Sequence, residues 1–186
     1  KYPNLNLDLM LEERVLDLPM READVAIRMK EPSQADLIRK RLMGVRMRLY
    51  AVPDYLREHG TPETPEDLSR HRLICQNPRA PQVSAGASLV GELMTHQPRS
   101  TLTVNNYFGV LQGVLAGLGI GVLPEYLSLD FPEMQPVLPN VVSNEVPVFL
   151  AYPEELRQSR RIAAFRDFVQ SEISLQRRQQ RDRAAE

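Results

Sequence analysis

The sequence has little that would support disulfide, metal or membrane chemistry. Cys75 is the only cysteine among 186 residues, which excludes an intramolecular disulfide and a cysteine-based zinc site, and we expect it to be a buried structural thiol rather than a redox sensor. The histidines (His59, His71 and His96) are too widely spaced for a zincin-type pair, so no metal site is predicted. No apolar run approaches the roughly 18–20 residues of a membrane span, and no signal-peptide pattern is found. We therefore expect a folded cytoplasmic protein.

The sequence also lacks an excess of one charge and a recognisable catalytic motif. Its 23 basic and 24 acidic residues give a net charge of −1, so no global charge attracts the chain to nucleic acid or to an anionic membrane. No serine stands in a nucleophile elbow, and the carboxylates fall at presumed helix starts and turns. The sequence therefore predicts that the chain is not an enzyme and carries no cofactor.

Several segments have strand patterns. Residues 5–11 alternate leucine with other side chains, which predicts a half-buried strand. The segment DVAIR, residues 24–28, has a continuous apolar centre and is expected to be a central strand of a parallel sheet that is covered on both faces. Alternation returns over residues 45–52, which predicts a long strand with one exposed face. Further strands are expected at residues 72–76, 100–105, 120–123 and 145–153.

Helix signals separate these strands. Residues 53–60 are expected to form a short helix that Gly60 closes, and Thr64 with Pro65 begins another within residues 61–71. Residues 77–88 are interpreted as a loop. Longer helices are predicted over residues 107–118 and 162–173, and residues 176–186 are expected to be a frayed helical tail or disordered. Strands that alternate with helices indicate an α/β protein.

The glycine-rich stretch from Asn105 to Leu127 raises the question of a phosphate-binding loop. A dinucleotide fingerprint needs its glycines before a helix, whereas here they follow one, so this interpretation is weak. Gly119 is expected to be the left-handed residue that ends the helix. Gly113 and Gly117 share one helix face, which predicts close packing against a neighbouring element.

The order and spacing of several segments resemble one family. The segments are YPNLNLDL, READVAIR, LYAVPDYLREHGTPETPEDLSRHRLI, TVNN followed by LAGLGIGVLP, and FLAYP followed by RIAAFRDFV. Together they resemble the effector-binding domain of LysR-type transcriptional regulators, and the similarity extends to about Val169. The resemblance implies a two-lobed α/β fold like that of type II periplasmic binding proteins, with two crossover strands and an effector held between the lobes.

The resemblance also implies a division of the chain. Lobe one would comprise residues 1–50 and 151–175, lobe two residues 51–150, and residues 176–186 would be a tail. The crossovers would place hinge positions at Tyr50, Ala51, Ala151 and Tyr152. The N-terminal winged helix-turn-helix of the family is missing from this sequence, so DNA would be bound only through that missing domain. Paired effector domains of the family imply a homodimer or tetramer.

Two groups of residues are the predicted effector contacts. Arg28 is the last residue of the strand predicted for residues 24–28, and Met29 follows it. Ligands of parallel α/β sheets bind beyond the carboxyl ends of the strands, so both residues are expected near the effector. Asn105, Asn106 and Tyr107 begin a helix, whose N-terminus offers N–H donors to an anion. A structural ion pair for Arg28 and simple N-capping by the asparagines are the competing interpretations.

Three function classes follow from these patterns. The leading hypothesis is the ligand-sensing domain of a LysR-type regulator, which binds a small organic effector and so modulates the DNA-bound protein. A solute-binding protein of a transport system shares the implied fold. An enzyme is the third class, because catalytic partners can lie far apart in a sequence.

Overall fold

The computed structural model describes residues 2–11, 16–29, 31–32, 34–77 and 87–184. The chain forms two compact units. Unit 1 comprises Lys1–Met10, Val15–Gly44 and Pro147–Glu186, and unit 2 comprises Leu11–Arg14 and Val45–Val146. The chain thus passes from unit 1 to unit 2 after Gly44 and returns after Val146, and Leu11–Arg14 is also assigned to unit 2. The division into lobes after residues 50 and 150 stays a prediction.

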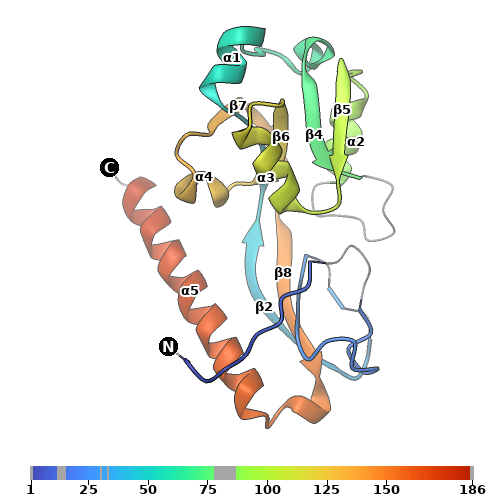
Figure 1. Ribbon diagram of the computed structural model, residues 1–186, viewed down its shortest axis with the longest axis vertical. Coiled ribbons are helices and arrows are strands. Elements are labelled where there is room, and N and C mark those ends of the chain that lie inside the picture. Colours follow the sequence, from blue (N-terminus) through green and yellow to red (C-terminus); the bar gives the residue numbers. More distant parts are fainter. Residues whose placement is uncertain (1, 12–15, 30, 33, 78–86, 185–186) are drawn as a thin grey trace. The chain divides into compact units, whose positions relative to one another are not determined.

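Unit 1 contains a three-stranded sheet (Figure 1). Its strands are β1 (Ala26–Arg28), β2 (Leu37–Val45) and β8 (Val146–Pro153), in the order β1-β8-β2. The expectation that residues 24–28 form a central parallel strand covered on both faces is wrong, because β1 lies at the sheet edge, antiparallel to β8, with Ile27 52% exposed. Its apolar character reflects Ala26, which packs against a buried cluster of Leu18, Leu37 and Ala151.

The predicted half-buried strand at residues 5–11 is also wrong. Residues 5–11 form no strand, and Leu7, Leu9 and Leu11 are 61%, 74% and 58% exposed. A period of two places alternate side chains on one face, but it supplies no partner for the backbone N–H and C=O groups. Within the described residues no strand pairs with this segment.

Helical segments complete unit 1. The short 3₁₀ helix η2 (Glu154–Leu156) follows β8, and α5 (Arg160–Ala184) follows η2. The predicted helix over residues 162–173 is confirmed as part of α5, with Ile162 buried. α5 continues to Ala184, so residues 176–184 of the expected tail are helical, and residues 185–186 lie outside the described residues. No helix within the described ranges combines the length and apolar character that membrane crossing requires.

Unit 2 is built on a five-stranded sheet with the order β5-β4-β6-β3-β7. The strands are β3 (Met47–Ala51), β4 (Arg72–Gln76), β5 (Ser100–Val104), β6 (Ile120–Pro124) and β7 (Gln135–Val142), and the helices are α1 (Pro53–His59), η1 (Pro65–Arg70), α2 (Ala87–Met94), α3 (Tyr107–Leu115) and α4 (Leu127–Asp130). β4 runs parallel to β5 and β6, whereas β3 runs antiparallel to β6 and β7. α3 packs on β4, β5 and β6 (Figure 1).

Several local predictions for unit 2 are confirmed. Gly60, with φ of 85°, closes α1, and the Asp67 carboxylate accepts a hydrogen bond of 3.0 Å from the Thr64 N–H at the start of η1. Cys75 is fully buried in β4. The alternation over residues 45–52 is confirmed on its apolar side, but the strand breaks at Arg46, and Tyr50 is buried as well because β3 lies between β6 and β7. Residues 78–86 of the predicted loop lie outside the described residues, and α2 begins within that loop at Ala87.

α3 ends in a Schellman motif, which corrects the prediction for Gly119. The left-handed residue is Gly117, with φ of 68°, and the Leu118 N–H donates to the Gly113 carbonyl at 3.0 Å. Gly119 is needed for a different reason, because a Cβ at this position would lie 2.5 Å from the Arg72 carbonyl oxygen. Close packing is confirmed at Gly113, where a Cβ would lie 3.2 Å from Ile74. It is not confirmed at Gly117, where the nearest atom, of Val52, would lie 3.8 Å away.

A pair of hydrogen bonds joins the two ends of unit 2. The Met47 N–H donates to the Ser143 hydroxyl at 2.9 Å, and the Ser143 N–H donates to the Met47 carbonyl at 3.0 Å. Ser143 is only 8% exposed, and its hydroxyl in turn donates to the Asn144 carbonyl at 2.7 Å. The segments that enter and leave unit 2 are therefore held together at this point.

Candidate functional site

Polar groups gather in unit 2 where β4 and β5 end and α3 begins. Gln76 and Val104 are register partners at the carboxyl ends of these two parallel strands, and Asn105 and Asn106 connect β5 to α3. Ligands of α/β sheets bind beyond the carboxyl ends of strands, and a helix N-terminus adds N–H donors and a positive dipole end. This part of the sheet therefore suits an anionic or polar ligand.

The asparagines are fixed by their hydrogen bonds. Asn106 is the N-cap of α3, because its Oδ1 accepts from the Gly109 N–H at 2.8 Å, while its Nδ2 donates to the Asn105 Oδ1 at 2.9 Å. The N-capping interpretation of Asn106 is thus confirmed. Capping leaves the N–H of Phe108 without an acceptor among the described residues, and this residue is 61% exposed.

Gln76 is a residue of this site that the sequence analysis missed. Its Nε2 donates to the Asn105 carbonyl at 3.3 Å, which orients the amide, and its Oε1 is buried with no partner within the described residues. A buried acceptor without a partner is costly unless a ligand or water supplies a donor. Gln76 ends the apolar strand RLIC as Arg28 ends DVAI, so the reasoning used for Arg28 would have found it.

Tyr107 lies beside this group, at the first position of α3. It is half-buried, and its charge is among the causes that raise the pKa of Tyr126, after burial, which is the largest. Tyr126 therefore lies close enough to Tyr107 for the two side chains to interact. We define the unit 2 cluster as Gln76, Asn105, Asn106, Tyr107 and the N–H of Phe108.

Arg28 and Met29, the other predicted effector contacts, belong to unit 1. Arg28 is half-buried, and its Nη2 donates to the Leu16 carbonyl at 2.5 Å. Burial lowers the pKa of its guanidinium, and the nearby charge of Asp17 opposes that shift. The structure therefore gives Arg28 a structural hydrogen bond while keeping a charged group at the end of β1.

The predicted hinge residues all lie inside strands. Tyr50 and Ala51 are buried in β3 of unit 2, and burial is the main cause that raises the pKa of the Tyr50 hydroxyl. Ala151 and Tyr152 are buried in β8 of unit 1, where Ala151 is paired with Ala26 of β1. Their role in hinge motion stays a prediction. Within the described residues no group of three or more His, Cys, Asp or Glu side chains is placed to hold a metal ion.

Comparison with known proteins decides the family. Residues 1–174 match the family described as the LysR substrate binding domain. The chain belongs to this family. A regulator named CrgA from Neisseria meningitidis serogroup C is 29% identical over 93% of this chain and 59% of its own length, and an uncharacterized HTH-type transcriptional regulator of Haemophilus influenzae is 25% identical over 82% and 54%. The chain thus spans little more than half the length of these relatives.

Solved structures of LysR-type regulators share the fold of this LysR substrate-binding domain. The CrgA regulatory domain of N. meningitidis superposes with a TM-score of 0.65 at 23% identity, over 84% of this chain and 78% of that one. The AphB regulatory domain of Vibrio vulnificus gives 0.60 at 22% identity, over 90% and 84%. The expected α/β, two-lobed, periplasmic-binding-protein-like fold is therefore confirmed, with one sheet in each unit. The chain is an effector-binding domain of the LysR type.

Proposed function

We propose that this chain is the ligand-sensing part of a LysR-type transcriptional regulator and that the unit 2 cluster holds its effector. The family match over residues 1–174 supports the regulator role. One observation supports the ligand site above all, namely the buried Oε1 of Gln76, an acceptor that lacks a partner within the described residues beside the start of α3.

The cluster favours a small organic acid that also carries a hydrogen-bond donor. The N-terminus of α3 and the N–H of Phe108, which has no acceptor among the described residues, favour negative charge on the ligand. A hydroxyl or amino group on the same ligand would satisfy Gln76 Oε1. Arg28, with Met29 beside it, is the proposed contribution of unit 1, and its guanidinium suits a carboxylate.

The effector would act by favouring one arrangement of the two units over another. A ligand shifts such an equilibrium only by its difference in affinity for the two states. We propose that contacts from both units supply this difference, with Tyr50, Ala51, Ala151 and Tyr152 close to the segments that carry the motion.

The remaining attributes of the whole protein are also proposals. By analogy with its relatives we propose a cytoplasmic homodimer or tetramer that contacts DNA only through an N-terminal domain, and we expect no catalytic turnover. A solute-binding protein is the alternative of the same fold. It is not favoured, because the curated relatives are named transcriptional regulators.

The experiment is a thermal-shift screen of this chain against small hydroxy acids, amino acids and aromatic acids. A ligand that binds only the native state raises stability by RT ln(1 + [L]/Kd), about 2.7 kcal/mol at 100 times Kd. The binding constant is then measured for Gln76→Met, which keeps the size of the side chain but removes both polar atoms. Arg28→Ala tests the contribution of unit 1.

A matched pair at Asn106 separates capping from binding. Asn106→Ser retains an N-cap oxygen, whereas Asn106→Ala removes it at a cost of about 0.5–2 kcal/mol of stability. We expect Asn106→Ala, Arg28→Ala and Gln76→Met each to weaken effector binding by about 1–3 kcal/mol. Unchanged affinity in all three variants would exclude the proposed site, and chemical conversion of the bound compound would show an enzyme instead.

A further inference from the structure

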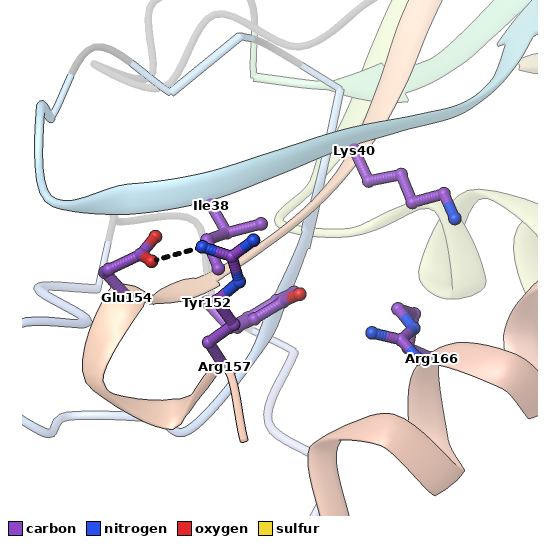
Figure 2. Close-up of a pocket in the computed structure, with 6 residues that line it drawn as sticks. All are labelled: Ile38, Lys40, Tyr152, Glu154, Arg157 and Arg166. Atoms are coloured by element: carbon purple, nitrogen blue, oxygen red, sulfur yellow. Dashed lines mark hydrogen bonds and ion pairs between the residues drawn. The ribbon is translucent and has the colours of Figure 1, made fainter. Parts of the chain in front are cut away.

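A polar pocket lies within unit 1, and none of its residues belongs to the unit 2 cluster. It has a volume of about 500 Å³ and is lined by Ile38, Lys40, Tyr152, Glu154, Arg157 and Arg166 (Figure 2). Ile38 and Lys40 belong to β2, Tyr152 to β8, Glu154 to η2 and Arg166 to α5, while Arg157 is the residue that follows η2. A volume of this size is within the range of small-molecule sites, which are roughly 300–1,000 Å³.

Positive charge exceeds negative charge in this pocket. Lys40, Arg157 and Arg166 face one lining carboxylate, Glu154, which accepts from Arg157 at 3.1 Å. Asp167 lies next to the pocket and pairs with Arg166 at 2.9 Å. Glu154 pairs with Arg157 and Asp167 pairs with Arg166, so the two carboxylates balance two of the three cations. The third cation, Lys40, has no ion-pair partner within the described residues.

Arg166 and Tyr152 are hydrogen-bonded to each other in the pocket wall. The Arg166 side chain is only 28% exposed, and its pKa is raised by hydrogen bonds to Asp167 and then to Tyr152. Tyr152 is 4% exposed, so its ring is fixed at the end of β8. Figure 2 shows the Tyr152 hydroxyl, the Lys40 ammonium group and the Arg166 guanidinium turned toward one space between β2 and α5.

This combination is chemically selective. A guanidinium presents paired N–H donors to an oxyanion, an ammonium group adds a flexible point charge, and a tyrosine hydroxyl donates a further hydrogen bond. An oxyanion placed between them would also compensate the charge of Lys40. Ile38 supplies an apolar surface on the same wall, which suits the organic part of a ligand.

We propose that this pocket of unit 1 is a second ligand site, which binds the phosphate or carboxylate group of a small organic anion. The site is separate from the unit 2 cluster in its residues and in its unit of the fold. Its lining residues lie on β2, at the end of β8, and on η2 and α5, which come next in the sequence. One bound ligand would therefore contact β2, β8 and α5 at the same time.

The test is a titration of the ¹⁵N-labelled chain with sodium phosphate and, separately, with sodium succinate, each followed by ¹H–¹⁵N NMR at constant ionic strength. Lys40→Gln removes the unpaired charge from an exposed side chain. Tyr152→Phe removes the hydroxyl and keeps the buried ring. Arg161→Gln is the matched control, because Arg161 is an exposed cation of α5 that does not line the pocket.

We expect saturable shifts of the Ile38, Lys40 and Tyr152 amides with at least one of the two anions, and the anion that binds more tightly identifies the preferred group. The dissociation constant should rise about tenfold in Lys40→Gln and also rise in Tyr152→Phe, as loss of a charge-assisted hydrogen bond requires, and it should be unchanged in Arg161→Gln. Linear shifts that are equal in all four proteins, or shifts confined to residues 105–109, would overturn the proposal. The last outcome would instead support the unit 2 cluster.

Discussion

The position of α3 depends on a glycine beneath it, and this dependence is testable. A Cβ built on Gly121 of β6 would lie 2.2 Å from Val114 Cγ2 and 3.1 Å from Val110 Cγ1. Carbon atoms in contact are normally about 3.5–4.0 Å apart, so Gly121→Ala must displace α3 or force Val114 from its rotamer. Overpacking of this kind costs about 1–3 kcal/mol.

The same contact predicts compensation. Val114 is fully buried, and Val114→Ala removes two methyl groups, worth about 2 kcal/mol with the cavity that they leave. The double variant Gly121→Ala with Val114→Ala adds one methyl group where two were lost. We therefore expect it to be less destabilised than the sum of the single variants by about 1–3 kcal/mol.

The assay is urea unfolding followed by far-UV circular dichroism, because the chain has no tryptophan. Gly91→Ala in α2 is the matched control, since no atom lies within 4 Å of a Cβ at that position. It should leave stability unchanged or raise it by up to about 1 kcal/mol. A Gly121→Ala variant as stable as the native chain, or strict additivity in the double variant, would refute the packing argument.

Three further predictions concern unit 2. Ser143→Ala should cost about 1–3 kcal/mol in urea unfolding, because the buried Met47 N–H loses its acceptor, and a native-like midpoint would count against this role. Cys75→Ser should destabilise by a similar amount without changing effector affinity, and because burial raises the pKa of the thiol, native Cys75 should resist alkylation until the chain unfolds. Burial, with the charge of His59 next, lowers the pKa of His71, so the unfolded chain binds the proton more tightly and the free energy of unfolding should fall as the pH drops below about 6.5, the unfolded value. His71→Asn keeps an acceptor for the Tyr55 hydroxyl, which lies 3.2 Å from His71 Nδ1, and should flatten this pH dependence, whereas an unchanged slope would assign it to other groups.

Sequence reasoning succeeded where the structural signal is local. Gly60 closes α1 and Asn106 caps α3, and each acts through its own backbone or through a neighbour three residues away. The buried strand β6 was found because IGVL is a short apolar run that Pro124 ends, and the structure buries all of its residues. These signals need no knowledge of the sheet to which an element belongs.

The sequence predictions failed for strands whose structure depends on their position in the sheet. β2 was missed because Arg39, Lys40 and Arg41 interrupt its apolar ends. All three are exposed although consecutive strand residues point to opposite faces, so this part of β2 is solvated on both faces. β7 was missed because it contains Pro136 and Pro139, which are acceptable only at a sheet edge, where β7 in fact lies. Whether a strand lies at an edge depends on the order of all the strands in the sheet, and so does the availability of a partner for residues 5–11. Neither can be predicted from a single segment.

The same limit applies to the candidate site. The N-terminus of α3 was predictable, since its cap and its helix are local. Gln76 comes close to Asn105 only because β4 and β5 are parallel neighbours, and the pocket of unit 1 unites β2 with α5 across more than a hundred residues of sequence. Contacts of this kind are set by topology.

The hydrogen bonds between Ser143 and Met47 close most of unit 2 into a ring. Met47 and Ser143 are 96 residues apart in the sequence, and their two hydrogen bonds fasten the beginning of this long segment to its end. A segment closed in this way cannot fray from one end alone, so we expect β3 and the residues that follow β7 to lose their structure together.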